Sequence, residues 1–266
     1  MKNILAFLGS ALLLAGCMGG NHDLVPAAKQ LDVLANAHNV DGFAAQMTDD
    51  VVLKAPDGKL YKGKDAVKGW LGSMFAGFQV ESRGYQQSGD TVSWMSVIHA
   101  SGFAAMGLST AKANTFAVFT GDKVRYFEAG LDGETAGKMA MIQFYAEVIN
   151  GGNIDAVEKY VAADMVEHQP LPPGAPTGVE GVKGYFKSVH ESFPDIHATV
   201  NLVMAEGDLV TVAATFEGTN KGKFMGKPAS NKKYTWTGSD IIRLKDGKAV
   251  EHWGWDDMAD RMAHEK

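Results

Sequence analysis

The chain has 266 residues, of which 45% are hydrophobic and 21% are charged, a composition typical of soluble globular proteins and not of disordered or fibrous ones. Its formal net charge is −6 and its basic residues are spread along the sequence, so we expect no nucleic-acid partner. A single cysteine excludes an internal disulfide and a metal site made of several thiolates.

The N-terminus has the pattern of an export signal. Lys2 precedes an apolar run, residues 4–15, and small residues before Cys17 follow at once, so we expect residues 1–16 to be a signal peptide. The run is too short for a membrane span, which needs about 20 residues. The alternative is a buried first helix that carries a cysteine by chance.

Leu14-Ala15-Gly16-Cys17 resembles the bacterial lipobox. The resemblance implies that Cys17 is acylated, for example by palmitate, and becomes the mature N-terminus, with residues 17–27 as the lipidated cysteine and its tether. It also implies a cell-envelope protein anchored in a membrane through Cys17. Met18 after the cysteine favours the outer membrane, facing the periplasm. Several acyl chains on one residue give stable anchoring, whereas one chain is marginal.

The rest of the sequence contains an internal repeat, which indicates a tandem array of one small domain. Landmarks recur in the same order in both halves: residues 40–50 match 154–164, residues 62–70 match 177–185, Phe78 matches Phe193, residues 88–90 match 206–208, and residues 121–124 match 246–250. Polar residues and glycines interrupt the apolar pattern over residues 131–138, which places the boundary there. We therefore expect domains at residues 28–135 and 136–266.

Each half begins with helical patterns and continues with strand patterns, which predicts an α+β domain. In the second half, apolar residues at steps of three and four over 179–193 predict an amphipathic helix. Thr177 and Glu180 have the spacing of a capping box at its start. The period then changes to two over 210–216 and 234–244, which predicts strands. Asp246-Gly247 predicts a hairpin turn after them.

Alternation along the strands separates the side chains into faces. On the last strand, one face carries Glu251, Trp253, Trp255 and Asp257, and the other carries His252, Gly254 and Asp256. On the preceding strand, Asp240 falls in step with Tyr234, Trp236 and Ile242. Asp257 and Asp240 are therefore both expected among bulky apolar side chains.

A carboxylate that aromatic side chains shield from water has a raised pKa and can move protons near neutral pH. Asp257 and Asp240 are for this reason candidate acid/base residues. The alternative is structural, because either carboxylate can instead pair with an arginine such as Arg243 or accept from a backbone turn.

His168 lies in residues 167–174, a segment too rich in proline for a helix or a central strand. In a loop, a histidine can act as an acid, a base or a hydrogen-bond donor to a substrate carbonyl, or it can fix the loop by bonding to backbone. The sequence shows no His-Glu-x-x-His, Gly-x-Ser-x-Gly, phosphate-binding or dinucleotide motif. We expect no metal and no cofactor.

A series of short motifs over residues 139–258 resembles the SnoaL-like polyketide (ester) cyclase family. The motifs lie at residues 168–170, 178–183, 193–195, 206–208, 218–228, 240–243, 246–248 and 251–253. The resemblance implies the nuclear transport factor 2-like fold, a cone in which a curved antiparallel sheet wraps around helices and leaves a pocket. Residues 31–132 resemble a more divergent copy, with residues 55–58 in place of the His-Pro loop and Arg125-Tyr126-Phe127 in place of Glu-His-Trp.

Characterised members of this family close polyketide rings by intramolecular aldol chemistry without a cofactor. By position, the resemblance implies as catalytic candidates His168, Asp240, His252 and Asp257. The side chains expected to contact the substrate are Trp236, Trp253, Trp255, Tyr234, Phe216 and Asn220. Asn220 stands where the family usually has His after Gly-Thr.

Three functions remain open, because a fold alone does not give a function. In the first, the second domain is an enzyme that cyclises, isomerises or hydrolyses a small apolar carbonyl compound, with Asp257 as acid/base and His168 or His252 polarising the carbonyl. In the second, it is an envelope module that binds a hydrophobic molecule or a protein partner. The third possibility is an intrachain pseudo-dimer, in which the two copies pack sheet to sheet in place of a homodimer. The enzyme requires Asp257 or Asp240 to line a pocket within reach of a histidine.

Overall fold

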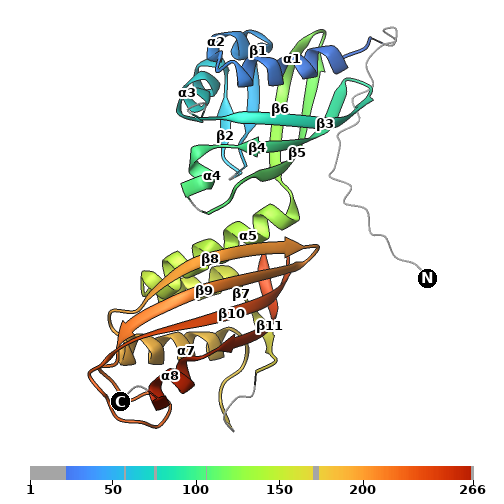
Figure 1. Ribbon diagram of the computed structural model, residues 1–266. Coiled ribbons are helices and arrows are strands. Elements are labelled where there is room, and N and C mark those ends of the chain that lie inside the picture. The colour runs from blue at the N-terminus through green and yellow to red at the C-terminus, as the bar shows by residue number, and fades with distance from the viewer. Residues whose placement is uncertain (1–21, 57, 75–76, 106, 170–173, 265–266) are drawn as a thin grey trace, which may run out of the picture.

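The computed structural model describes residues 22–56, 58–74, 77–105, 107–169 and 174–264, which form two sheets with helices packed on each (Figure 1). The expected α+β class is confirmed. The predicted signal peptide, residues 1–16, and Cys17 lie outside the described residues. Within the described ranges, no helix is long and apolar enough to cross a membrane.

The first copy begins with two helices and ends in a sheet. Its elements are α1 (Val25–Asn36), α2 (Val40–Ala45), β1 (Met47–Lys54), β2 (Leu60–Lys62), α3 (Lys64–Met74), β3 (Gln79–Ser88), β4 (Thr91–His99), α4 (Ser101–Ala105), β5 (Ala111–Thr120) and β6 (Lys123–Leu131). The strand order is β2-β1-β6-β5-β4-β3, and all pairs are antiparallel except β1 with β6.

The second copy repeats this plan. Its elements are α5 (Gly133–Phe144), the π-helix η1 (Tyr145–Asn150), the 3₁₀ helix η2 (Ile154–Ala156), α6 (Val157–Tyr160), β7 (Val161–Glu167), α7 (Gly178–Ser192), β8 (His197–Glu206), β9 (Leu209–Thr219), β10 (Lys233–Lys245), β11 (Lys248–Asp256) and α8 (Met258–His264). The order β7-β11-β10-β9-β8 matches β1-β6-β5-β4-β3 strand for strand, and the parallel pair is at the same place.

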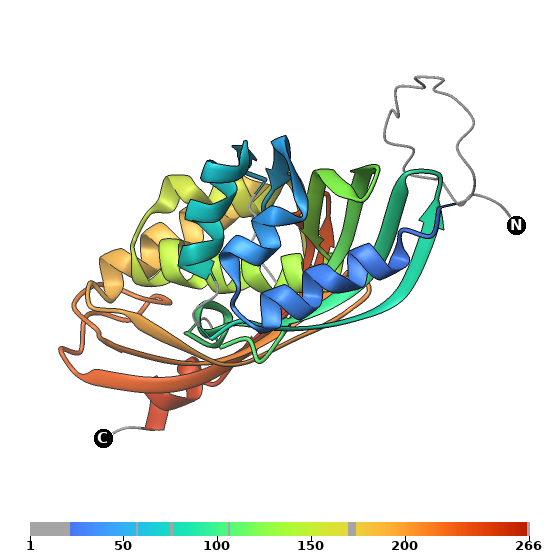
Figure 2. The ribbon, with the colours of Figure 1, turned by 90° about the horizontal axis from the view of Figure 1, so that it is seen from above.

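The two copies share details of packing as well as topology. Asn36 exchanges two side-chain hydrogen bonds with the backbone of Val80, and Asn150 does the same with Ala198. In both copies this pair fixes the end of the first helical segment to the edge strand of the sheet. Seen from above, the blue and teal helices α1 to α3 and the yellow helices α5 and α7 lie on the same side of their sheets, whereas the red C-terminal helix α8 lies on the other side (Figure 2). The predicted duplication is confirmed.

Local sequence explains the helix and the hairpin that carry most of the site. In α7, Val189 is buried, as is Phe193 after it, which confirms the predicted apolar stripe. Asp246 and Gly247 both have positive φ angles, 51° and 78°, as a tight hairpin turn requires.

The predicted capping box at the start of α7 is wrong. The Thr177 side chain makes no capping hydrogen bond, and Glu180 lies 3.5 Å from Lys183 instead. Gly178 has a φ of 63°, so the chain does not begin the helix with the backbone angles that a capping box needs.

Helix α5 connects the two copies. Asp132 caps it by accepting from the Thr135 amide, and the Thr135 hydroxyl accepts from the amide of Lys112 in β5. Met139 and Ile142 of the same helix pack against the first core, as does Val203 of β8. The main contacts between the described parts of the two copies are therefore made by a helix, not by two sheets laid face to face, and a homodimer remains a prediction.

Candidate active site

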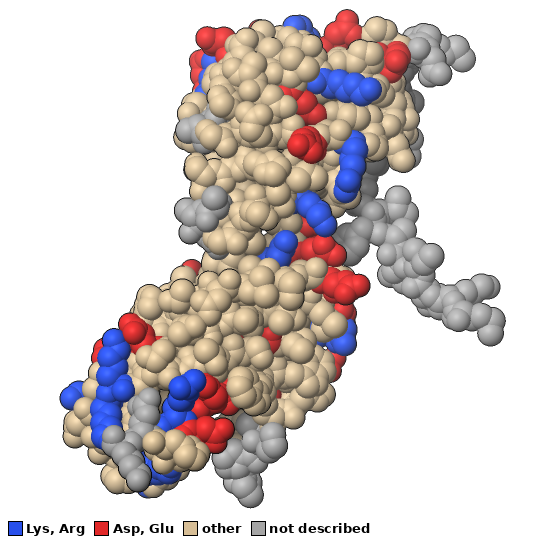
Figure 3. Space-filling view, in the orientation of Figure 1, with Lys and Arg blue, Asp and Glu red and all other residues tan. Residues whose placement is uncertain are grey.

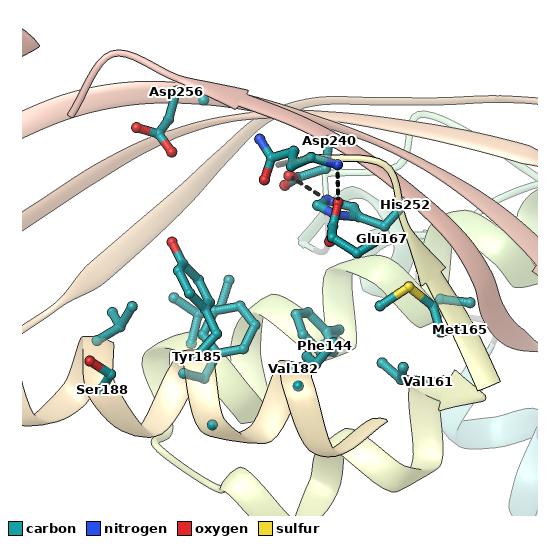
Figure 4. Close-up of a pocket in the computed structure, with 18 of the residues that line it drawn as sticks. Phe144, Val161, Met165, Glu167, Val182, Tyr185, Ser188, Asp240, His252 and Asp256 are labelled. Atoms are coloured by element: carbon teal, nitrogen blue, oxygen red, sulfur yellow. Dashed lines mark hydrogen bonds and ion pairs between the residues drawn. The ribbon is translucent and has the colours of Figure 1, made fainter. Parts of the chain in front are cut away.

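A cavity of about 800 Å³ opens between α7 and the inner face of the second sheet (Figure 4). Most of its wall is apolar: the lining includes Met141, Phe144, Met165, Val182, Phe186, Ile196, Phe216, Phe224 and Trp236. The ionisable side chains among the described lining residues are Tyr145, Glu167, Tyr185, Asp240, His252 and Asp256. No lysine or arginine is among these lining residues. The cavity combines the volume and apolarity of a small-molecule site with a few polar groups.

Four of these side chains form a continuous hydrogen-bonded network along one wall. His252 on β11 has its Nδ1 atom 2.6 Å from Glu167 Oε2 and its Nε2 atom 3.0 Å from Asp240 Oδ1. The Tyr145 hydroxyl donates to the other oxygen of Asp240. Glu167 also accepts from the amide of Gln169 at 2.9 Å. Each ring nitrogen of His252 faces a carboxylate, so both nitrogens carry protons and the ring is an imidazolium.

The charges of this network support that protonation state. Burial alone lowers the pKa of His252, but the hydrogen bonds to Asp240 and Glu167 outweigh it and raise the pKa to about 9. Burial raises the pKa of the Tyr145 phenol, and the negative charge of Asp240 raises it further. At neutral pH the network therefore holds one imidazolium between two carboxylates and keeps Tyr145 protonated.

Two further ionisable side chains, Tyr185 and Asp256, project into the cavity. Tyr185 points from α7 toward the sheet, and Asp256 hangs from the end of β11 on the opposite wall (Figure 4). Burial raises the pKa of Asp256, against a hydrogen bond from the Met258 amide that lowers it, and the charge of Asp240 raises it further. Tyr185 is 53% exposed, and the protein around its ring, together with the charges of Asp256 and Asp240, raises the phenol pKa.

Gly254 gives the network room to close. A Cβ atom at this position would lie 2.9 Å from His252 Cε1 and 3.1 Å from both Asp240 Oδ1 and Gln169 Nε2. The Gln169 side chain donates to the Gly254 carbonyl, so backbone and network approach each other closely here. Only a residue without a side chain allows this approach.

Five of the side chains predicted from the sequence line the cavity. Asp240 and His252 hydrogen-bond to each other, so the geometric requirement for an enzyme is met by Asp240. Trp236 and Phe216 stack with ring centroids 5.5 Å apart and form part of the apolar wall. Trp255 also lines the cavity but is 61% exposed, which places it at the rim.

Asp257 and His168, two predicted catalytic residues, are not among the residues that line the cavity. The Asp257 carboxylate accepts from the Thr237 amide at 2.7 Å and from Arg261 at 2.9 Å, the structural role left open from the sequence. His168 lies on the outer face of the sheet, where it stacks on Trp253 with ring centroids 4.3 Å apart and bonds to Glu251. The expected placement of these two residues and of Trp253 is therefore wrong.

Tyr234 and Asn220 hydrogen-bond to the loop before β10. The buried Asn220 side chain donates to the Gly222 carbonyl and accepts from the Ser230 amide. The Tyr234 hydroxyl donates to the Ser230 hydroxyl. Both side chains are absent from the described cavity lining because the loop uses their polar groups to hold its own backbone.

Sequence reasoning missed Tyr145, Glu167, Tyr185 and Asp256 as site residues. Strand alternation predicts Asp256 on the same face as His252, which is the face that lines the cavity. The two indoles, Trp253 and Trp255, instead favour the opposite face as the site. Glu167 pairs with His252 in the parallel β7–β11 register, which no local pattern shows. The two tyrosines come from η1 and α7, so only helix docking brings them to the sheet.

The network has no counterpart among the described residues of the first copy. In the second copy, His252 lies opposite Ile242 in the last hairpin. The equivalent pair in the first copy is Phe127 opposite Ala117. Phe127 therefore takes the place of His252, one residue later than Tyr126, which the sequence comparison matches to it. By the same registers, Thr115 and Leu53 take the places of Asp240 and Glu167. The corresponding cavity is about 70 Å³ and mostly apolar. The described lining of this cavity includes one carboxylate, Asp32, which accepts from the Tyr85 hydroxyl, but no histidine.

The fold and the position of the cavity define a tandem pair of nuclear transport factor 2-like domains. Residues 139–264 match the model of the SnoaL-like polyketide cyclase family, and residues 28–129 match the model of the SnoaL-like domain. The chain therefore contains two SnoaL-like domains in tandem, the second of which matches the polyketide cyclase model. None of the curated proteins matches the chain significantly.

Solved structures of single domains resemble about half of the chain. IdmH from Streptomyces antibioticus, assigned as a polyketide cyclase, is 30% identical, with 48% of this chain and 96% of that chain covered and a TM-score of 0.42. A protein from Bacillus cereus with the same assignment is 29% identical, with 48% and 79% covered and a TM-score of 0.42. One from Acidithiobacillus ferrooxidans is 26% identical, with 50% and 95% covered and a TM-score of 0.43.

Proposed function

We propose that the second domain is a cofactor-free acid/base enzyme that cyclises or isomerises a largely apolar carbonyl compound. One observation carries the proposal: an apolar cavity of about 800 Å³ holds on opposite walls a phenol, Tyr185, whose hydroxyl has no hydrogen-bond partner among the described residues, and a carboxylate of raised pKa, Asp256. Asp256 is exposed to the cavity, and its raised pKa makes it a stronger base than an ordinary aspartate. The family match to polyketide cyclases supports the same chemistry.

The charge of the cavity restricts the substrate class. The described lining contains three carboxyl side chains, those of Glu167, Asp240 and Asp256, and one imidazolium, that of His252. It includes no lysine or arginine to balance the excess of carboxyl groups. A negatively charged substrate would be repelled at such a site. The proposed substrate is therefore a neutral ester or ketone and not a free carboxylic acid.

The proposed reaction uses the Asp256 carboxylate and the Tyr185 hydroxyl together. Asp256 takes a proton from the carbon next to a carbonyl, while the Tyr185 hydroxyl donates a hydrogen bond to that carbonyl oxygen as it becomes an enolate. The enolate carbon forms a bond to a second carbonyl of the same molecule, and the proton on Asp256 passes to the new alkoxide oxygen. The proton is returned and no electron is gained or lost, so the step needs no oxidant or cofactor.

The network of Tyr145, Asp240, His252 and Glu167 has a positioning role in this scheme. All its donors are already paired within the network, so none of them is free to polarise a carbonyl. Its contribution is the fixed negative charge of Asp240, which raises the pKa of Asp256. Asp240→Asn should therefore shift the pH dependence of the reaction toward lower pH.

Proton abstraction can be tested without the natural substrate. The chain from residue 22 onward contains both cores, and it is incubated in D₂O with aromatic ketones and keto esters, with 1-tetralone as the simplest probe, while proton exchange is followed by NMR. Asp256→Asn should lower the enzyme-catalysed rate by about 10²–10⁴-fold and Tyr185→Phe by about 10²-fold. His168→Gln, outside the cavity, is the control. The proposal fails if exchange by the wild type equals that of buffer, or if Asp256→Asn leaves it unchanged.

Binding without chemistry is the second candidate function, and the size and apolarity of the cavity favour it. The same probes separate the two functions, because a pure binding module should bind 1-tetralone equally well with Asp256→Asn and exchange no protons. A protein partner instead of a small molecule would leave the cavity empty in such a titration.

We also propose that the chain is exported and anchored to the outer membrane through acylated Cys17, facing the periplasm. The support is the sequence pattern of residues 1–17. In a bacterial host, the wild type should incorporate a palmitate analogue and sediment with membranes, whereas Cys17→Ala should lose the label. Retention of the label in this variant would refute the assignment of the acylated residue.

A further inference from the structure

Five lysines gather in one loop at the end of the second sheet. They are Lys221, Lys223, Lys227, Lys232 and Lys233, and no acidic residue lies between the first and the last of them. The chain as a whole carries a net charge of −6, so this positive segment stands out from the rest of the protein. It is an exception to the even spread of basic residues along the sequence. Basic side chains gather at this end of the second domain in Figure 3.

These lysines are only partly neutralised by the protein. Lys233 lies 3.1 Å from Glu217, and Lys221 donates to the Asn231 side chain at 3.4 Å. The side chains of Lys223 and Lys227 are exposed and make no hydrogen bond or ion pair within the described part of the chain. The loop therefore presents unpaired positive charge to a partner outside the protein.

The loop is fixed to the body of the domain. The amides of Lys221 and Gly222 both donate to the Ser192 carbonyl at the end of α7, and the Ser192 hydroxyl donates to the Lys223 carbonyl. The Phe224 ring packs edge-on against the buried Phe193. The positive charge is consequently held in one place and does not depend on a disordered tail.

At the tip of the loop, a methionine occupies an unfavourable backbone position. Phe224 and Lys227 exchange two backbone hydrogen bonds across a two-residue turn, in which Met225 has a φ of 48° and Gly226 a φ of 80°. Such a turn favours Asn or Gly at its first position, and a bulky side chain there is strained. Met225 is nevertheless 66% exposed, so its apolar side chain is not held there by packing.

The tip also forms part of the cavity opening. Met225 and Trp255 both line the cavity, and both are more than half exposed. Met225 lies between Lys223 and Lys227 in the loop. An exposed apolar side chain flanked by lysines is a pattern with which peripheral proteins bind anionic membranes: the lysines meet lipid headgroups and the apolar side chain inserts at the boundary with the acyl chains.

We infer that this lysine loop docks on an anionic phospholipid surface, so that the cavity opens toward the membrane. The charge of the loop matches anionic headgroups, and the exposed Met225 and Trp255 match the interfacial region below them. An apolar ligand can then move between the membrane and the cavity without crossing water. This inference depends on the cavity and its rim and not on the proposed proton transfer.

The test measures binding of the chain from residue 22 onward to vesicles, so that a lipid anchor at Cys17 plays no part. We expect sedimentation with vesicles of phosphatidylcholine and phosphatidylglycerol in about equal amounts, but not with phosphatidylcholine alone, and a loss of binding as salt is added. Lys223→Gln with Lys227→Gln should weaken binding about fivefold per lysine. Lys62→Gln with Lys245→Gln, two exposed lysines away from the loop, is the control.

Met225→Asn separates membrane contact from loop structure. Asn suits the turn better, so the thermal stability should be unchanged or higher, whereas vesicle binding should fall because the apolar side chain is gone. Equal binding to neutral and anionic vesicles, no binding to either, or no effect of the lysine variants would overturn the inference. Binding to a soluble acidic protein with no binding to vesicles would also overturn it. Proton exchange on 1-tetralone in the same variants is read separately, so failure of one proposal is distinct from failure of the other.

Discussion

The two carboxylates on either side of His252 should make the stability of the second domain depend on pH. The ring lies between Glu167 and Asp240, and its pKa is raised from 6.5 to about 9. Because one pKa unit corresponds to about 1.4 kcal/mol, protonated His252 contributes about 3 kcal/mol to the stability of the second domain. A raised pKa in the folded state stabilises the fold fully below pH 6.5, and this contribution is lost as the pH rises through about 9.

The perturbation is His252→Gln, with His168→Gln as the matched control on the outer face of the sheet. In the wild type, the free energy of unfolding of the second domain should fall by about 3 kcal/mol between pH 6 and pH 10 in urea titrations. His252→Gln should remove this part of the pH dependence. It should also destabilise the domain at pH 6 by at least about 3 kcal/mol, because two carboxylates lose the cation between them. His168→Gln should keep the wild-type slope.

NMR titration of the histidine ring protons measures the pKa directly. The resonance that disappears in His252→Gln should titrate near pH 9. A midpoint at or below 6.5 would refute the reasoning, because it would mean that burial outweighs the two hydrogen bonds and that the ring is neutral at pH 7.

Three further substitutions test other parts of the site. Tyr145→Phe removes the phenol that donates to Asp240, and we expect a loss of about 1.5–3 kcal/mol in thermal unfolding, whereas no loss would mean that this bond does not form. Gly254→Ala places a Cβ atom 2.9 Å from the His252 ring, so the domain should lose about 1–3 kcal/mol and the His252 titration should move to lower pH; an unchanged titration would argue against the close approach. Asp257→Asn should cost about 1 kcal/mol or less and leave proton exchange on 1-tetralone unchanged, and a large loss of exchange would return this residue to the mechanism.

The sequence by itself determined the repeat, the fold class and the elements of each domain. These features depend on local periodicity and turn chemistry: the apolar stripe of α7 and the turn at Asp246-Gly247 are written in consecutive residues. Alternation also placed Asp240 correctly beside Trp236, because a regular strand has a fixed period of two.

Only the tertiary structure decided which face of β11 lines the cavity. Alternation separates His252 and Asp256 from Trp253 and Asp257, but it does not say which set is covered by helices. The indoles suggested the wrong set, because an aromatic side chain is also stable outside when it finds a partner, as Trp253 does with His168. The network itself joins η1, β7, β10 and β11, whose residues lie up to 107 positions apart in the sequence. Contacts at such separations follow from how the helices dock on the curved sheet, and no local pattern in the sequence specifies them.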